Sequence, residues 1–206
     1  MFLHSYRAMS ACSRIDAVVI LTPEGYGDAM QRWAGSLEGP GHLEIRAGGA
    51  TRLESVRRGL EALPEDAQVV VCHDAARPFA SPPLFDRVIE ALRDVEGVVP
   101  VVSSPDTVKR IRGGRVVETI PRHQLGVVQT PQAFLREALV DAHRRAGPAG
   151  ADATDDATLL EAAGYRVAAV EGEPRNFKIT TPEDLRRAEC VLADAEEAGA
   201  ATERTS

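Results

Sequence analysis

Short β-branched runs alternate with longer amphipathic stretches along the first half of the chain. The runs have the composition of buried strands and lie at 16–23, 42–46, 68–72 and 97–102; the stretches between them lie at 24–37, 52–63 and 82–95. This order predicts an α/β fold in which a mostly parallel sheet is sandwiched by helices. Because the run 68–72 is mostly apolar and bounded by polar residues, it is typical of a central parallel strand.

The middle of the chain has a different pattern. Two β-prone pieces within 106–124 flank Gly113 and Gly114, which is typical of a hairpin. The pieces are too polar for a central strand, so we expect an antiparallel β-arm over about 105–125 that projects from the sheet. An isolated hairpin is not stable in water, so we expect the arm to dock on a second copy of the chain.

The rest of the chain returns to the earlier alternation. We expect helices at 135–145 and 155–163, a strand at 166–170 and a last helix that opens at Thr181, whose side chain suits an N-cap. A length of 206 residues with 44% hydrophobic content suits one domain, which we place at 1–195. The small, polar residues 196–206 are expected to form a flexible tail.

Composition excludes several classes of protein. A net charge of −7 disfavours a basic nucleic-acid surface, and no apolar run has the length of a membrane span. The N-terminus is a poor signal peptide. The three cysteines are scattered without CxxC spacing, which argues against disulfides or zinc and predicts a cytoplasmic protein.

Lysine is rare in this chain. There are 22 arginines but only Lys109 and Lys178, so a position that keeps lysine could require an ammonium group in particular. Lys178 lies in a β-prone stretch just before the last helix. It could be a point charge for phosphate, or simply a solvated strand end.

Ligands of open α/β sheets bind at the carboxyl ends of strands. The run 68–72 ends in His73, Asp74 and, three residues on, Arg77. Asp74 is a plausible partner for Mg²⁺ or a sugar hydroxyl, and Arg77 for a phosphate. The alternative is an Asp–Arg pair that orders the loop. We expect His73 to be structural.

Other candidate positions are weaker when taken singly. Gly48 and Gly49 precede a helix and could let backbone N–H groups approach an anion, although a glycine pair alone is a weak signal. The sequence 154–156 is most simply a helix cap. Charged and hydroxyl groups at the base of the arm and just after it could equally belong to a solvated edge strand: Thr107, Lys109, Arg122 and Thr130.

Seven segments taken in order carry a family resemblance, and they cover most of the chain from 16 to about 190. They are GGATRLESVRRGL (48–60), HDAARPF (73–79), DTVKR (106–110), TIPRHQL (119–125), QTPQAF (129–134), TDDATLLEAAG (154–164) and EGEPRNFKITTPEDL (171–185). With these segments the chain resembles the 2-C-methyl-D-erythritol 4-phosphate cytidylyltransferase family of the non-mevalonate isoprenoid route.

The resemblance implies a nucleotidyltransferase fold with a β-arm that interlocks a homodimer. The implied reaction joins CTP to methylerythritol phosphate with Mg²⁺ and releases pyrophosphate. Since the substrate phosphate attacks the α-phosphorus of CTP, the protein contributes mainly positioning and charge neutralisation.

The same resemblance implies roles for individual residues. Lys178 and Arg122 correspond to residues that position the methylerythritol phosphate, with Arg122 coming from the neighbouring subunit. Further substrate contacts are implied at Arg77, Thr107, Thr130 and Thr154. Asp74 corresponds to the acid beside the CTP ribose and magnesium, and the cytidine pocket is implied at Gly48, Gly49 and Ser55. For Lys109 we expect a structural or electrostatic role.

The resemblance also has one departure. Members of the family open with a strand and a glycine-rich loop that wraps the CTP phosphates, whereas residues 1–20 resemble the helix and second strand that follow. We expect the strand and the loop to be encoded upstream, after an earlier start codon. The alternative is that the chain is a variant without catalysis. We therefore expect the 206-residue chain to have low activity, because the phosphate cradle contributes several kcal/mol of electrostatic stabilisation.

Two other functions remain open at this stage. Ribitol-5-phosphate cytidylyltransferase shares the fold and the CTP chemistry, although TIPR, TPQAF and TDDATLLE resemble the methylerythritol enzyme more. A non-catalytic subunit that dimerises with a full-length relative is a hypothesis of a different class. DNA upstream of Met1 would discriminate between the enzyme and this subunit.

Overall fold

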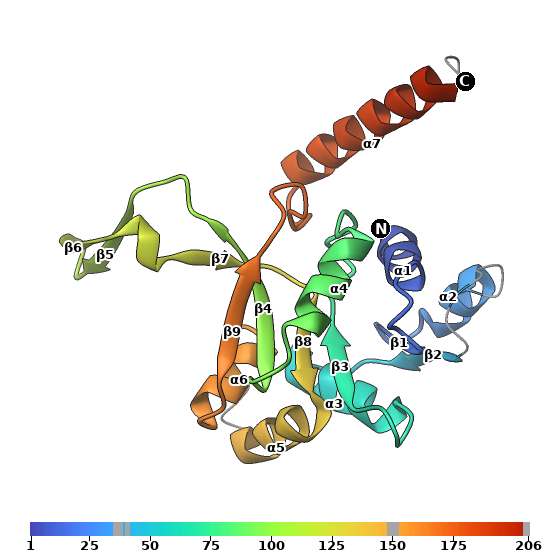
Figure 1. Ribbon diagram of the computed structural model, residues 1–206, viewed down its shortest axis with the longest axis horizontal. Helices are drawn as coiled ribbons and strands as arrows, with labels where there is room; N and C mark the ends of the chain where they lie inside the picture. Colours follow the sequence, from blue (N-terminus) through green and yellow to red (C-terminus); the bar gives the residue numbers. More distant parts are fainter. Residues whose placement is uncertain (35–38, 40–41, 148–152, 204–206) are drawn as a thin grey trace.

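The computed structural model describes residues 1–34, 39, 42–147 and 153–203 (Figure 1). In chain order the elements are α1 (Phe2–Ser10), β1 (Ala17–Thr22), α2 (Gly27–Ala34), β2 (His42–Ala47), α3 (Arg52–Ala62), β3 (Val69–Cys72), α4 (Pro82–Glu90), β4 (Gly97–Ser103), β5 (Val108–Arg112), β6 (Arg115–Ile120), the 3₁₀ helix η1 (Arg122–Gln124), β7 (Gly126–Val128), β8 (Gln132–Leu135), α5 (Arg136–Ala146), α6 (Asp156–Ala162), β9 (Val167–Glu171) and α7 (Pro182–Glu203).

These elements confirm the predicted alternation and the hairpin. The expected helix at 82–95 is shorter, since α4 ends at Glu90, and part of the expected helix at 24–37 lies outside the described residues. The backbone of α7 continues through Glu203, and 204–206 lie outside the described residues; a flexible tail over 196–206 stays a prediction.

The described strands form three sheets. β1 and β2 pair in parallel, with Ala17 opposite His42 and Thr22 opposite Ala47. Five strands form the main sheet, in the order β3-β8-β4-β7, with β9 along the other edge of β4. β5 and β6 form the antiparallel hairpin of the arm, turned by Gly113 and Gly114, both at positive φ.

The prediction of a mostly parallel sheet is wrong for the main sheet. β8 is antiparallel to both β3 and β4, β7 is antiparallel to β4, and only β9 runs parallel to β4. β3 is therefore an edge strand in the described sheet, with an antiparallel neighbour. An apolar run indicates that a strand is buried, but not whether its neighbour runs parallel to it. Here the chain that returns from the arm forms β8, which lies between β3 and β4.

β7 and β8 follow one edge of β4 with an interruption between them. Val128 pairs with Val101, and Ala133 pairs with Val98, so the register shifts by two residues across 129–131. The interruption contains the cis peptide bond between Thr130 and Pro131. Because this segment leaves the ladder, the Thr130 side chain can turn toward the end of β3.

Helices cover both faces of the main sheet, as expected. Alternate strand residues pack against α3, α5 and α6 on one face: Val70, Val99, Phe134 and Val167. The intervening residues Val71, Val98 and Ala133 pack against α4 on the other face. The core therefore consists of small and branched aliphatic side chains with few aromatic rings.

Helix starts follow the capping rules. The hydroxyls of Thr51 and Ser81 accept hydrogen bonds from backbone N–H groups in the first turns of α3 and α4, and Asp155 does the same for α6. The predicted cap at Thr181 is confirmed, since its hydroxyl accepts from the backbone N–H of Asp184. These caps fix where the helices begin relative to the ends of the strands.

Two segments extend away from the body (Figure 1). One is the arm, and the other is α7 at the C-terminal end. Among the described residues, none of the helices has both the length and the apolar character that crossing a membrane requires. A cavity of about 830 Å³ lies between β1 and β3, bordered by α3 and α1.

Candidate functional site

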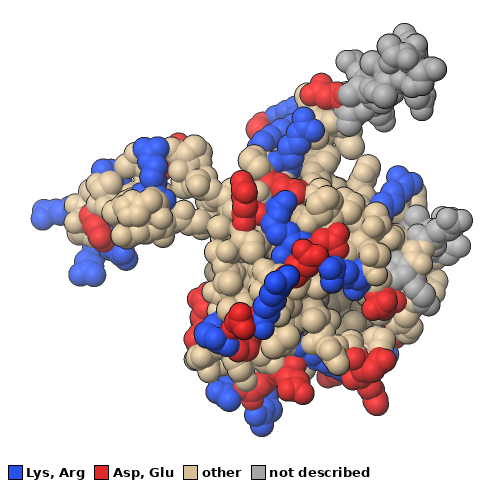
Figure 2. All heavy atoms as spheres, in the orientation of Figure 1, with Lys and Arg blue, Asp and Glu red and all other residues tan. Residues whose placement is uncertain are grey.

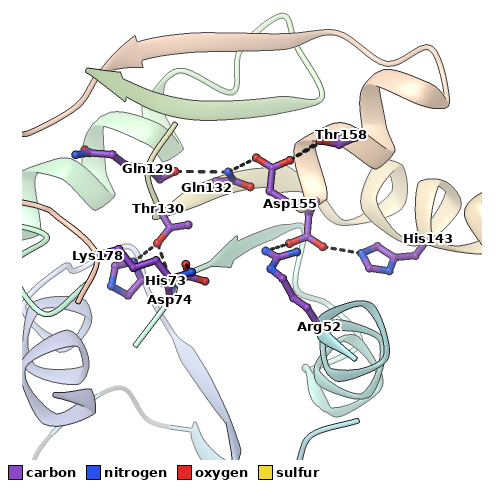
Figure 3. Close-up of polar contacts among 11 residues, drawn as sticks. Arg52, His73, Asp74, Gln129, Thr130, Gln132, His143, Asp155, Thr158 and Lys178 are labelled. Atoms are coloured by element: carbon purple, nitrogen blue, oxygen red, sulfur yellow. Dashed lines mark hydrogen bonds and ion pairs between the residues drawn. The ribbon is translucent and has the colours of Figure 1, made fainter. Parts of the chain in front are cut away.

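Asp74 and Lys178 meet beyond the carboxyl end of β3. Lys178 Nζ lies 2.9 Å from Asp74 Oδ2, and both side chains are partly exposed (Figure 3). The loop that carries Lys178 is fixed beside β3, because the N–H of Ile179 donates to the carbonyl oxygen of Ala76 at 2.8 Å. The structure thus places an ammonium and a carboxylate together at the sheet edge where ligands of α/β proteins bind.

Thr130 lies next to this pair. The backbone N–H of Asp74 donates to Thr130 Oγ1 at 3.0 Å, and Thr130 Oγ1 lies 3.1 Å from His73 Nδ1. His73 Nε2 lies 3.1 Å from the carbonyl oxygen of Arg77. Burial lowers the pKa of His73 to about 4, so its ring is neutral at physiological pH.

Arg77 is held by backbone carbonyl groups. Its NH1 donates to the oxygen of Asn176 at 2.9 Å and its NH2 to that of Val128 at 3.3 Å, while its buried Nε has no partner among the described residues. The alternative of an Asp–Arg pair that orders the loop is not found among the described residues, where Asp74 pairs with Lys178. Arg77 instead ties the loop after β3 to β7 and to the loop before α7.

The glycine turn before α3 is joined by a hydrogen bond to Ser55. Gly49 N–H donates to Ser55 Oγ at 2.9 Å, and Ser55 Oγ donates to the Thr51 carbonyl oxygen at 2.9 Å. A Cβ on Gly49 would lie 2.3 Å from the Glu54 side chain, so the turn requires glycine there. Ser55 lines the cavity together with Asp74.

Sequence reasoning missed a buried charge cluster near Thr154. The Asp156 carboxylate is fully buried and lies 2.6 Å from Arg52 NH2 and 2.9 Å from His143 Nε2. Burial alone would raise the pKa of Asp156, but the hydrogen bond from His143 and the charge of Arg52 outweigh it, and the pKa is lowered. The cluster ties α3 and α5 to the start of α6, just after the exposed Thr154.

Sequence reasoning also missed two buried amides that fix the Lys178 loop. Gln129 Nε2 donates to the carbonyl oxygens of Glu173 and Asn176, at 2.9 and 3.1 Å. Asn176 Nδ2 donates to the carbonyl oxygen of Thr130 at 2.8 Å. The sequence does offer one signal for these two residues. Each is an amide side chain within a β-prone stretch, and a buried amide requires a hydrogen-bond partner.

The arm residues are not brought to this site by the single chain. Thr107 and Arg122 are exposed at the two ends of the arm, and Lys109 Nζ donates to Thr119 Oγ1 across the hairpin at 2.6 Å. Five basic residues give the arm a cationic surface (Figure 2): Lys109, Arg110, Arg112, Arg115 and Arg122. The arm extends away from the body that carries Asp74 and Lys178 (Figure 1).

The fold and the strand-end pair define a nucleotidyltransferase-like α/β protein. Residues 1–194 match the family model for 2-C-methyl-D-erythritol 4-phosphate cytidylyltransferase, IspD, and the chain belongs to this family. The chain is 44% identical over 193 residues to the bifunctional enzyme IspD/IspF of Anaeromyxobacter dehalogenans, covering 91% of this chain and 49% of that enzyme. It is 47% identical over 172 residues to the corresponding enzyme of Solidesulfovibrio magneticus, covering 82% and 43%.

Solved structures agree with this assignment. The 4-diphosphocytidyl-2C-methyl-D-erythritol synthase of Anaerococcus prevotii superposes with a TM-score of 0.87 at 31% identity, over 93% of this chain and 88% of that one. The 2-C-methyl-D-erythritol 4-phosphate cytidylyltransferase of Thermus thermophilus gives a TM-score of 0.76 at 38% identity, over 94% and 89%. The chain spans about half the length of the curated relatives it matches.

Proposed function

We propose that this chain transfers CMP from CTP to 2-C-methyl-D-erythritol 4-phosphate in isoprenoid precursor biosynthesis. Family membership supports the reaction, and the observation that carries the proposal is the 2.9 Å contact between Lys178 and Asp74 at the end of β3. A lysine held by a carboxylate provides an oriented positive charge that can bind an incoming phosphate.

The chemistry is a displacement at phosphorus. A phosphate oxygen of the methylerythritol substrate forms a bond to the α-phosphorus of CTP, and the bond from that phosphorus to the bridging oxygen of pyrophosphate breaks. In this reaction Lys178 and Arg122 orient the attacking phosphate. Four further residues contribute to its binding: Arg77, Thr107, Thr130 and Thr154. Orientation and charge neutralisation are sufficient for large rate gains, since little covalent work falls to the protein.

Asp74 is the residue we propose to hold Mg²⁺ and to face the ribose of CTP. The described residues contain no group of three or more acidic, histidine or cysteine side chains that could hold a metal. One partly exposed carboxylate nevertheless fits Mg²⁺, which commonly takes one or two protein carboxylates together with substrate phosphates and water. When bound there, Mg²⁺ would neutralise charge on the phosphates.

The cytidine is proposed to bind at the glycine turn, with Gly48 and Gly49 contributing close backbone approach and Ser55 a hydroxyl. The support is that the turn is bonded to Ser55, and that Ser55 lines the same cavity as Asp74. A nucleotide that bridges the turn and Asp74 would place its phosphates beside Lys178.

We further propose that the protein is a homodimer joined through the arm. Ile111, Val116 and Val117 are between 52% and 61% exposed on a hairpin that extends from the body, and exposed apolar side chains of this kind favour an interface. A partner's arm would supply Arg122 and Thr107 to the site.

We propose residues 1–195 as the nucleotidyltransferase domain and the cytoplasm as its compartment.

The test is pyrophosphate release from CTP and Mg²⁺ with either methylerythritol phosphate or ribitol 5-phosphate. We expect product with methylerythritol phosphate, lowered about 100-fold in Asp74→Asn, with exposed Asp94→Asn as the matched control. Preference for ribitol 5-phosphate, or a rate equal to that of Asp74→Asn, would overturn the proposal.

A further inference from the structure

Two of the chain's five phenylalanines lie on the loops that bring Asp74 and Lys178 together. Phe177 directly precedes Lys178, and Phe79 lies in the segment between Asp74 and α4. Both side chains are half-buried, and their ring centroids are 5.4 Å apart with a tilt of 38°. Aromatic pairs at this separation attract each other, so the ring contact joins the two loops.

Helix α7 adds a third side chain to this contact. Arg187, in its second turn, places its guanidinium carbon 4.0 Å from the centroid of the Phe177 ring. A guanidinium stacks favourably on an aromatic face. Glu183, one turn earlier on the helix, pairs with Arg186 and not with Arg187. The ring is therefore the contact that fixes the Arg187 side chain.

We propose that Arg187 is a positioning residue for Lys178, because its stacking on Phe177 holds the Lys178 loop against the loop after β3. The inference rests on the proposed function of Lys178. On the other side of the lysine, the N–H of Ile179 donates to the carbonyl oxygen of Ala76 at 2.8 Å. Phe177 and Ile179 flank Lys178, so its backbone is held from both sides.

The stack also ties α7 to the site. This helix extends away from the body (Figure 1), and the Asp184 carboxylate in its first turn accepts from the N–H groups of Thr180 and Thr181 at 3.0 and 2.9 Å. The cap joins the start of the helix to the end of the Lys178 loop, and Arg187 reaches back to Phe177. A shift of the first two turns of α7 would therefore displace the loop that carries the lysine.

Hydrogen exchange at the Ile179 amide measures how firmly the loop is held, without relying on catalysis. We expect Arg187→Met to speed this exchange about twofold to fivefold, the range of an exposed cation–π contact. Amides of β4 should keep their wild-type rates. Arg186→Met, which removes the neighbouring exposed arginine, is the matched control and should leave Ile179 unchanged. An unchanged Ile179 rate in Arg187→Met would overturn the proposal.

A double-variant cycle tests whether Arg187 acts through Phe177. Phe177→Leu removes the ring, so Arg187→Met should add nothing further to the exchange rate of Ile179 in that background. Phe177→Tyr keeps the ring and should exchange like the wild type. Effects of the two substitutions that multiply in the double variant would contradict the proposed route.

Steady-state kinetics extend the test to the reaction. We expect Arg187→Met to lower kcat/KM for methylerythritol phosphate about twofold to fivefold. The KM for CTP should change little, because the proposed cytidine pocket lies at α3. A loss that persists in the Phe177→Leu background would indicate direct substrate contact by Arg187 and overturn the positioning role. If the wild-type chain forms no pyrophosphate, the proposed function fails, whereas Ile179 exchange still decides whether the stack holds the loop.

Discussion

The Nζ of Lys178 lies 2.9 Å from Oδ2 of Asp74, at the end of β3 and before α7. The lysine side chain is 46% exposed and the aspartate 27%, so the pair remains open to solvent and contributes little to folding stability. The pair instead orients the Lys178 side chain, because the carboxylate holds the ammonium group at the edge of the cavity that Asp74 lines.

Replacement of Lys178 should therefore affect catalysis far more than stability. We expect Lys178→Met to lower kcat about 100-fold to 1,000-fold, as removal of one oriented charge-stabilising group does. Lys178→Arg should recover only part of the rate, since a guanidinium is broader than an ammonium. Pyrophosphate release measures both.

The chain's other lysine supplies the control for that experiment. Lys109 bonds to Thr119 across the arm, so Lys109→Met should change the rate by no more than a few fold. Equal losses at the two positions would contradict a specific role for Lys178.

Charged substitutions on the arm should weaken the proposed dimer. We expect Val116→Asp or Val117→Asp to shift the protein toward monomer, because a buried unpaired carboxylate is costly at an apolar interface. Val140→Asp, at an exposed apolar position on α5, is the matched control. Sedimentation velocity measures the distribution, and a wild-type protein that sediments as a 22.1 kDa monomer would refute the dimer.

The Asp156 cluster should be a major determinant of stability. Loss of the buried carboxylate in Asp156→Asn leaves Arg52 and His143 without their charged partner, and we expect a decrease of about 3 kcal/mol in the free energy of unfolding. Urea denaturation measures this, with Asp94→Asn as the exposed control. A decrease below about 1 kcal/mol, the range of a surface ion pair, would contradict the prediction.

The start of α7 should loosen in acid. Backbone N–H groups of Thr180 and Thr181 and the Thr180 hydroxyl donate to the Asp184 carboxylate, and they lower its pKa to about 2. Since the folded pKa lies below the unfolded value of 3.8, the cap stabilises the helix above about pH 4 and is lost as the pH falls toward 2.

Hydrogen exchange at the first amides of α7 tests this cap. Protection should fall on acidification in the wild type and should be low at every pH in Asp184→Asn. Titration of the Asp184 carboxyl near 3.8 would contradict the prediction.

Local patterns determined much of the fold before any contact was known. Short β-branched runs predicted β1, β2, β3, β4 and β9, and the Gly113-Gly114 pair predicted the hairpin. These features depend on the periodicity of side chains and on the conformations open to glycine, which are properties of a few consecutive residues. β8, by contrast, was not predicted, because its four residues carry no distinct pattern and its partners are far away in the sequence.

The sequence by itself determined the family, most secondary-structure elements and the candidates Asp74, Lys178 and Thr130. Only the tertiary structure decided the antiparallel pairing of the main sheet, the contact of Lys178 with Asp74 rather than an Asp74–Arg77 pair, and the bond between Thr130 and His73. The physical reason is that periodicity specifies which face of a strand is buried, whereas direction of pairing and partner choice depend on how distant segments satisfy each other's backbone and buried polar groups.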